Sequence, residues 1–194
     1  MKIGVLCIQG AVREHVAALE KCGVEVICVK RKEQFADLDG LIIPGGESTT
    51  IGKLLDRFGL GASIIGMIVE GKPVYGTCAG LILLARKVEG SDQYLLGQMD
   101  ITVARNAFGR QRESFEAPLS IASLGEEPYC AVFIRAPLIK SVGENVETLA
   151  TCNGEIVAAR QGNLLVSAFH PELTDDTRMH RYFIEMVKEW KQKQ

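Results

Sequence analysis

The sequence lacks the features that mark several large classes of protein. Its 194 residues carry a net charge of −2, which argues against a dominant role in binding nucleic acid or a membrane surface. No segment reaches the roughly 18 uninterrupted apolar residues of a membrane-spanning helix. Internal repeats, low-complexity tracts and linkers are also absent. These absences favour one domain over residues 1–194, and a hydrophobic content of 47% suffices for its core.

The six cysteines show no pattern of a metal site or a disulfide framework. None forms C-x-x-C or pairs with histidines at zinc spacing, so we expect no bound metal. Cys7, Cys28 and Cys130 lie in apolar, strand-like runs and are predicted to fill the core. The apolar start of the chain breaks at Gln9-Gly10, which favours a first strand over a signal peptide. Free cysteines fit a reducing compartment, and we expect the protein to be cytoplasmic.

Strand and helix patterns alternate along the first half of the chain. We predict strands at residues 2–8, 24–29, 41–43 and 73–75 and helices at 11–21, 50–58, 62–70 and 79–87. Later segments are short strands between turns, at 100–104, 115–117, 131–134, 149–151, 156–161 and 164–169, and the chain closes with a helix at 176–191. This alternation predicts a flavodoxin-like three-layer α/β/α fold with a central, mostly parallel sheet and antiparallel strands added in the C-terminal half.

The segment Gly76-Thr77-Cys78-Ala79-Gly80 places a cysteine between two glycines, after an apolar strand and before an apolar helix. This is the spacing of the nucleophile elbow G-x-S-x-G, with sulfur in place of oxygen. The turn is sharp, and glycines on both sides avoid a clash. An elbow would hold the thiol at the carboxyl edge of a sheet, beside helix N–H groups that favour an anion. Because a free cysteine is more often buried in a core, the catalytic interpretation of Cys78 depends on partners elsewhere.

His170-Pro171-Glu172 supplies such partners directly after a predicted strand. In an extended segment residues i and i+2 face the same way, and proline restricts both its own backbone and that of the residue before it. Glu172 is therefore expected to reach the imidazole of His170, as a carboxylate that orients a base. A strand-end histidine beside a surface glutamate is about equally consistent with the spacing alone. The elbow cysteine in the same chain favours the triad, because sites in open α/β sheets gather at the carboxyl ends of strands.

The intermediates of acyl transfer at a cysteine need an oxyanion hole. One donor is expected to be the backbone N–H of Ala79, the residue after the nucleophile. Gly45 and Gly46, in Pro44-Gly45-Gly46 after the third strand, are candidates for the second donor. A simple turn is the commoner use of Pro-Gly-Gly, but the polar sequel Glu47-Ser48-Thr49-Thr50 points to a site, unless Ser48 or Thr49 only caps the next helix.

Several segments together resemble those of a known family. They are Pro44-Gly45-Gly46-Glu47-Ser48-Thr49, Gly76-Thr77-Cys78-Ala79-Gly80, Phe169-His170-Pro171-Glu172, Gln9-Gly10-Ala11-Val12-Arg13-Glu14-His15, Arg105-Asn106-Ala107-Phe108-Gly109-Arg110-Gln111 and Phe133-Ile134-Arg135-Ala136-Pro137. The chain resembles the class I (triad) glutamine amidotransferases over its whole length, and among them the glutaminase subunits of pyridoxal 5'-phosphate synthases. Ala107 is one departure, since a small hydroxyl residue is expected there.

The resemblance implies hydrolysis of L-glutamine to glutamate and ammonia, with Cys78 as nucleophile and His170 and Glu172 completing the triad. It also implies a set of residues that bind glutamine: Gly46, Glu47, Ser48, Arg105, Ile134 and Arg135. An arginine suits the α-carboxylate of glutamine, while an acidic residue or carbonyl oxygens suit its α-ammonium. Which arginine meets which group stays open, and Arg105, Arg110 and Arg112 are equally consistent with a solvated face.

The resemblance further implies a partner. Ammonia released into water becomes mostly ammonium, a poor nucleophile, so the glutaminase is expected to dock on a barrel-shaped, ring-forming synthase subunit and deliver ammonia internally. Gln9 and Gly10 are placed near the oxyanion hole and the partner surface, where they are expected to couple assembly to activity. Pyridoxal phosphate is then the pathway product, and no cofactor is expected in this chain.

Three other interpretations remain at this point. One is a class I amidotransferase subunit with a different acceptor, which differs only in its partner. Another is a stress-type cysteine protein of similar architecture, although those usually have histidine directly after the cysteine, where this chain has Ala79. The third is a binding module with an inert thiol. The two histidines outside the triad are predicted to be unremarkable, with His15 at the surface or an interface and His180 solvated.

Overall fold

The structure is a computed structural model that describes residues 1–105 and 114–194. Within these ranges most strands join one ten-stranded sheet, in the order β2-β1-β3-β4-β12-β11-β9-β6-β5, with β10 paired to β11. Its strands are β1 (Lys2–Leu6), β2 (Glu25–Val29), β3 (Gly40–Ile43), β4 (Val74–Thr77), β5 (Ala85–Val88), β6 (Met99–Ala104), β9 (Leu138–Val142), β10 (Glu147–Cys152), β11 (Glu155–Gln161) and β12 (Leu164–Ser167). A separate antiparallel pair consists of β7 (Ser114–Leu119) and β8 (Tyr129–Ile134).

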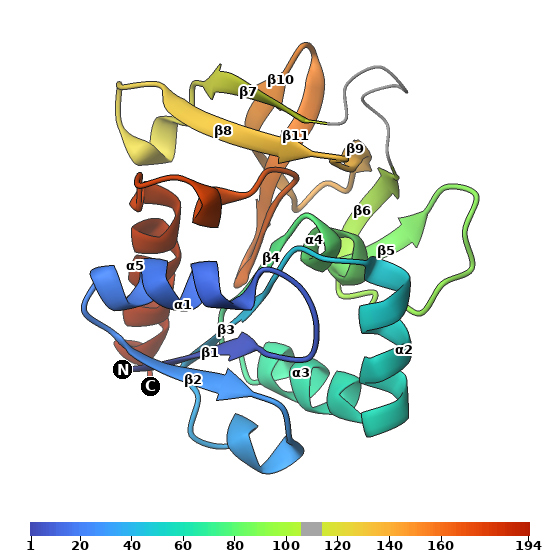
Figure 1. Ribbon diagram of the computed structural model, residues 1–194, viewed down its shortest axis with the longest axis vertical. Helices are drawn as coiled ribbons and strands as arrows, with labels where there is room; N and C mark the ends of the chain where they lie inside the picture. Colours follow the sequence, from blue (N-terminus) through green and yellow to red (C-terminus); the bar gives the residue numbers. More distant parts are fainter. Residues whose placement is uncertain (106–113) are drawn as a thin grey trace.

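Helices cover both faces of the parallel part of the sheet (Figure 1). They are α1 (Val12–Lys21), α2 (Ser48–Phe58), α3 (Leu60–Val69), α4 (Ala79–Leu84) and α5 (Arg178–Lys191), with short 3-10 turns η1 (Lys32–Phe35), η2 (Ala122–Leu124) and η3 (Pro171–Leu173). Helices α1 and α5 lie together on one face, while α2 contacts both α3 and α4 on the other (Figure 1). The predicted three-layer α/β/α fold is confirmed.

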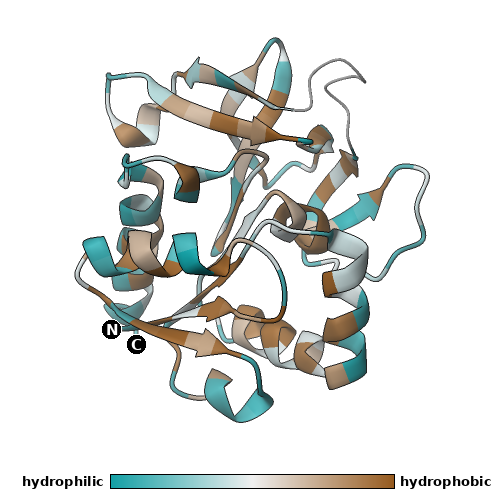
Figure 2. Ribbon diagram, in the orientation of Figure 1, coloured by the Kyte–Doolittle hydropathy of each residue, from teal (hydrophilic) through white to brown (hydrophobic). Residues whose placement is uncertain are grey.

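Apolar runs explain why the central strands are buried on both faces. Strands β3, β4 and β12 are buried at every position, as expected of parallel strands between two helical layers. Figure 2 shows hydrophobic and hydrophilic bands alternating along the helices, as expected of helices with one face against the sheet. Aromatic rings tie the layers together, since Tyr75 of β4 packs against Phe183 of α5 at 5.7 Å between ring centroids.

The register of the parallel strands places their carboxyl ends along one edge. Ile43 of β3 pairs with Gly76 of β4, and Gly76 pairs with Val166 of β12. The segments that follow β1, β3, β4 and β12 therefore meet there, and they carry the residues predicted to form the site apart from Arg105, Ile134 and Arg135, which lie at the ends of β6 and β8.

Several local predictions were wrong. The helix predicted at 79–87 ends at Leu84, because Ala85–Val88 forms β5, in which Ala85 pairs in parallel with Met99 of β6. Strand β9 was not predicted, and β7 and β8 pair apart from the main sheet. Cys28 is exposed because β2 is an edge strand, Cys130 is exposed on the open side of β8, and Cys7 is only partly buried.

Among the described residues, no helix combines the length and the apolar character that crossing a membrane requires.

Candidate active site

Cys78 lies on a sharp turn between β4 and α4. Its backbone has φ 47° and ψ −97°, an unusual conformation for a residue with a side chain, and its N–H donates to the carbonyl of Ser167 at 2.8 Å. A Cβ on Gly76 would lie 2.5 Å from the carbonyl carbon of Gly80, and one on Gly80 would collide with the carbonyl oxygen of Ile43. Both glycines are therefore required for the turn, as the sequence indicates.

His170 and Glu172 form a buried pair beside this turn. The Nδ1 atom of His170 lies 2.7 Å from Oε1 of Glu172, whose side chain is completely buried. The predicted proximity is correct, but the predicted extended geometry is wrong, because β12 ends at Ser167 and Pro171–Leu173 forms the 3-10 turn η3. The N–H of His170 donates to the carbonyl of Val132 at 2.8 Å, which anchors the start of this turn to β8.

The surroundings of His170 favour its protonated form. Burial acts to lower the pKa of His170, but hydrogen bonding to Cys78 and Glu172 raises it to about 10. Burial likewise acts to raise the pKa of Glu172, yet the nearby His15 and the hydrogen bond with His170 leave it below its ordinary value. The raised pKa of His170 therefore favours an imidazolium at neutral pH, beside the Glu172 carboxylate and the side chain of Cys78.

The Pro44-Gly45-Gly46 loop packs directly against these side chains. A Cβ on Gly45 would lie 2.5 Å from Cε1 of His170 and 3.3 Å from Cβ of Cys78, so only glycine fits. The carbonyl of Gly45 accepts from the N–H of Ala11 at 3.0 Å, which ties the loop to the start of α1. Ala79, the other residue predicted to contribute to an oxyanion hole, is buried at the first position of α4.

Gln9 and Gly10 meet the same loop from the end of β1. The Oε1 atom of Gln9 accepts from the backbone N–H of Glu47 at 2.9 Å. Gly10 has φ 110°, and a Cβ there would collide with the carbonyl oxygen of Gly45. The structure thus brings the predicted coupling residues against the predicted oxyanion loop.

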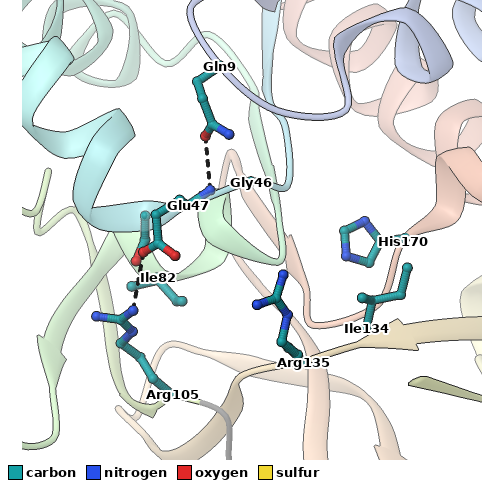
Figure 3. Close-up of a pocket in the computed structure, with 9 residues that line it drawn as sticks. Gln9, Gly46, Glu47, Ile82, Arg105, Ile134, Arg135 and His170 are labelled. Atoms are coloured by element: carbon teal, nitrogen blue, oxygen red, sulfur yellow. Dashed lines mark hydrogen bonds and ion pairs between the residues drawn. The ribbon is translucent and has the colours of Figure 1, made fainter. Parts of the chain in front are cut away.

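A cavity of about 300 Å³ opens beside His170 (Figure 3). Its lining includes all the residues predicted to bind glutamine, together with Gln9, His170 and Ile82. Arg105 is already engaged, since its guanidinium lies 3.2 Å from both Glu47 Oε1 and Gln93 Oε1. Figure 3 shows Arg135 reaching into the cavity between this ion pair and His170.

Arg135 differs from Arg105 in having no hydrogen bond or ion pair with any residue that the structure describes. It is exposed and has φ 44°, a left-handed conformation that costs energy for a residue with a side chain. Arg110 and Arg112, which the sequence left undecided, and Ala107 lie outside the described residues.

Sequence reasoning missed or misjudged several residues of the site. Gln93 receives hydrogen bonds from both Ser48 and Arg105, but it lies in a loop with no recognisable motif. Ser48 and Thr49 are not the cap of α2, because Glu47 occupies that position and accepts from the N–H of Thr49. His15 and His180 are both fully buried, so the predictions were wrong that His15 lies at the surface or an interface and that His180 is solvated.

Comparisons with known proteins agree with this geometry. The chain belongs to the SNO glutamine amidotransferase family, which it matches over residues 5–189. It is 61% identical to "Pyridoxal 5'-phosphate synthase subunit PdxT" of Geobacillus thermodenitrificans (strain NG80-2), over 98% of this chain and 97% of the relative. The protein of the same name from Niallia circulans is 59% identical, over 97% of this chain and 99% of the relative.

A solved structure described as "Crystal structure of glutamine amidotransferase" has the same fold. It superposes with a TM-score of 0.92 at 47% sequence identity, over 96% of this chain and 98% of that one.

Proposed function

We propose that this protein is the glutaminase subunit of a pyridoxal 5'-phosphate synthase, and that it hydrolyses L-glutamine at Cys78. The observation that carries the proposal is the buried His170–Glu172 pair, 2.7 Å apart, beside a cysteine held on a strained elbow at the carboxyl edge of the sheet. Membership in the glutamine amidotransferase family and 59–61% identity to two PdxT subunits support the reaction and its setting.

The reaction begins with His170 holding the proton of the Cys78 thiol. The thiolate attacks the side-chain carbonyl carbon of glutamine, and the carbonyl oxygen becomes an oxyanion. Backbone N–H groups of Ala79 and of the Gly45-Gly46 loop are the proposed donors to that oxygen. When the C–N bond breaks, His170 gives its proton to the leaving nitrogen, and ammonia departs from a thioester on Cys78.

In the hydrolysis of the thioester, His170 acts as a base where it acted as an acid before. His170, now neutral, removes a proton from a water molecule, whose oxygen attacks the thioester carbonyl carbon. Collapse of the second tetrahedral intermediate breaks the C–S bond and restores the thiolate–imidazolium pair, and the product leaves as glutamate once its new γ-carboxyl group gives its proton to water. Glu172 stays ionised throughout, orients His170 and stabilises its charge.

The cavity supplies groups for both ends of free glutamine. We assign the α-carboxylate to Arg135, because its guanidinium faces the cavity with no described partner while Arg105 is occupied by Glu47 and Gln93. Glu47 and the backbone carbonyl of Ile134 suit the α-ammonium, with Arg105 holding the Glu47 carboxylate in place. Gly46 and Ser48 complete the binding wall.

The ammonia needs an acceptor, which we propose is a barrel-shaped, ring-forming synthase subunit that receives it without release to water. Gln9 and Gly10 contact the oxyanion loop from the end of β1 and are the proposed route by which docking changes activity. We also propose that residues 1–194 act as one domain in the cytoplasm, where six free cysteines are chemically compatible with a reducing medium.

The test is the Cys78→Ala variant assayed together with the synthase subunit. Glutamine hydrolysis should vanish, while docking and synthesis from added ammonium salts should persist. A variant that still forms glutamate would disprove the mechanism. A wild-type chain that docks on a different synthase would instead reassign the acceptor.

A further inference from the structure

Two histidines outside the reaction just described are buried behind the triad. His15 lies on α1 and His180 on α5, 165 residues apart, and neither has any exposed surface. Helix α1 also contacts η3, the turn that carries Glu172 (Figure 1). Burying two imidazoles costs free energy unless their ring nitrogens form hydrogen bonds, so we identify the partner of each nitrogen.

The ring nitrogens form a chain that ends at Glu172. His180 Nε2 lies 3.0 Å from His15 Nδ1. The other nitrogen of His15, Nε2, lies 3.1 Å from Thr77 Oγ1 and 3.4 Å from Glu172 Oε2. This carboxylate oxygen is buried and makes no hydrogen bond with the described residues, so the 3.4 Å contact brings His15 Nε2 close to an acceptor that lacks a donor, whereas Oε1 of the same carboxylate faces His170.

Two arrangements of protons satisfy the His15–His180 contact, and the number of unsatisfied groups decides between them. If His15 carries its proton on Nδ1, it donates to His180 and accepts from Thr77. Glu172 Oε2 then has no donor, and the Nδ1–H of His180 is a buried donor without a described acceptor. If His15 carries its proton on Nε2, it accepts from His180 and donates toward Glu172 and Thr77. Only the lone pair on His180 Nδ1 is then left over.

The second arrangement is favoured, because a buried carboxylate oxygen without a donor is far more costly than an unused imidazole lone pair. Both rings are also neutral. Burial lowers the pKa of His15, although Glu172 acts against the shift, and burial together with the neighbouring His15 lowers the pKa of His180 to about 3. A neutral ring has one proton to place, so the tautomer of His180 determines that of His15.

We propose that His15 is a positioning residue of the triad, which donates its Nε2–H to Glu172 Oε2, with its tautomer fixed by His180. The inference rests on the proposed function in one respect, namely that Glu172 orients His170. Glu172 is then held by a ring on each oxygen, and it cannot rotate away from His170 without losing the bond to His15. Helices α1 and α5, which contribute none of the described residues that line the cavity, thereby set the orientation of the catalytic base.

The proton positions can be measured without any activity. The chain has only three histidines, so imidazole ¹⁵N spectra of the intact wild-type protein at pH 7 resolve each ring. We expect His15 and His180 to be neutral with the proton on Nε2, and His170 to be charged. A His15 ring with no proton on Nε2 would overturn the proposal, and a doubly protonated His15 would remove the role of His180.

The kinetic test is a double-mutant cycle in the complex with the synthase subunit. His15→Leu should lower kcat for glutamine hydrolysis by roughly tenfold to a hundredfold with little change in KM. In the Glu172→Gln background, the same substitution should have almost no further effect, because its partner is already altered. Additive losses would show that His15 does not act through Glu172.

Two further variants separate positioning from packing. His15→Gln places an amide N–H close to the position of Nε2 and should recover much of the lost kcat. Leu19→Ala on the same buried face of α1 should lower the melting temperature and leave kcat unchanged. If His15→Leu does not fold, the cycle is repeated with His15→Asn, whose shorter amide reaches the position of Nδ1 only. Failure of the wild-type complex to hydrolyse glutamine would count against the proposed function, while the spectra would still test the bond.

Discussion

The two sides of the His170–Glu172 pair differ in their exposure to water. On the cavity side, the Glu47 and Arg105 side chains are 52% and 31% exposed. On the opposite side, Glu172 and His15 have fully buried side chains, 3.4 Å apart. Charges in water are screened and free to rearrange around a ligand, whereas buried groups are held by the few partners they have. We call the exposed cavity side, with Glu47 and Arg105, the wet side, and the buried side, with Glu172 and His15, the dry side. Changes on the wet side should therefore act mainly on substrate binding, and changes on the dry side should act on turnover and stability.

Substitution of His170, which lies between the wet and the dry side, should have the largest effect on glutamine hydrolysis. His170→Asn removes both the proton carrier and the positive charge that faces Cys78, and members of a catalytic unit are not independent. We expect kcat for glutamine hydrolysis in the synthase complex to fall by roughly 10⁴-fold or more. Synthesis from added ammonia should remain, which shows that the complex still assembles. Residual hydrolysis within tenfold of wild type would contradict the role of His170.

Loss of the Arg135 guanidinium, on the wet side, should have a smaller effect, and it should act on KM rather than on kcat. Arg135→Gln removes a guanidinium that has no described partner to disturb, so its loss should cost only the substrate contact. A hydrogen bond to a charged group is worth about 1.5–3 kcal/mol, so KM for glutamine should rise roughly tenfold to a hundredfold. Arg135→Lys keeps the charge and is the matched control, with a smaller rise expected. A fall in kcat at unchanged KM would place Arg135 with the catalytic groups instead.

Much of the fold and of the site could be predicted from the sequence, and part of each could not. The apolar runs and the Gly76–Gly80 elbow are local signals, and they predicted the parallel strands and the edge at which Cys78 and His170 lie. The end of α4 at Leu84 and strand β5 depend on pairing with β6, which no local pattern shows. His15 sits next to Arg13 and Glu14 and resembles a surface residue. Its burial becomes visible only when α5 supplies His180 and η3 supplies Glu172.

The dry side should also make the protein sensitive to acid. His15 and His180 have folded-state pKa values below their ordinary 6.5, with that of His180 at about 3, so the unfolded chain binds more protons below pH 6.5. The free energy of unfolding should therefore fall as pH drops from about 6.5 toward 3, by up to about 1.4 kcal/mol per pH unit for His180, and the lowered pKa of His15 adds a loss of the same sign. Glu172, with its lowered pKa, adds a loss of the same sign at lower pH.

Urea unfolding across this pH range measures how steeply the free energy of unfolding changes with pH. His180→Leu should flatten this dependence between pH 6.5 and 4, whatever its effect on stability at pH 7. The raised pKa of His170 acts in the opposite direction, since its contribution is present below pH 6.5 and is lost as pH rises toward 10. An unchanged acid slope in His180→Leu would show that this ring is not held neutral by burial.

The smallest effect should come from the surface ion pair between Lys21 and Asp175, which is a second link between α1 and the segment around η3. Lys21 at the end of α1 lies 2.8 Å from Asp175, just beyond η3, so this ion pair joins the segments that His15 and Glu172 join in the interior. Its side chains are 58% and 98% exposed, and such pairs contribute little because water and salt screen them and ordering the side chains costs entropy. Lys21→Met should therefore leave kcat, KM and the unfolding midpoint unchanged within error, in contrast to His15→Leu. A loss of turnover in Lys21→Met comparable to that in His15→Leu would mean that any tether between α1 and η3 suffices, and that burial of the His15–Glu172 contact has no special part in orienting His170.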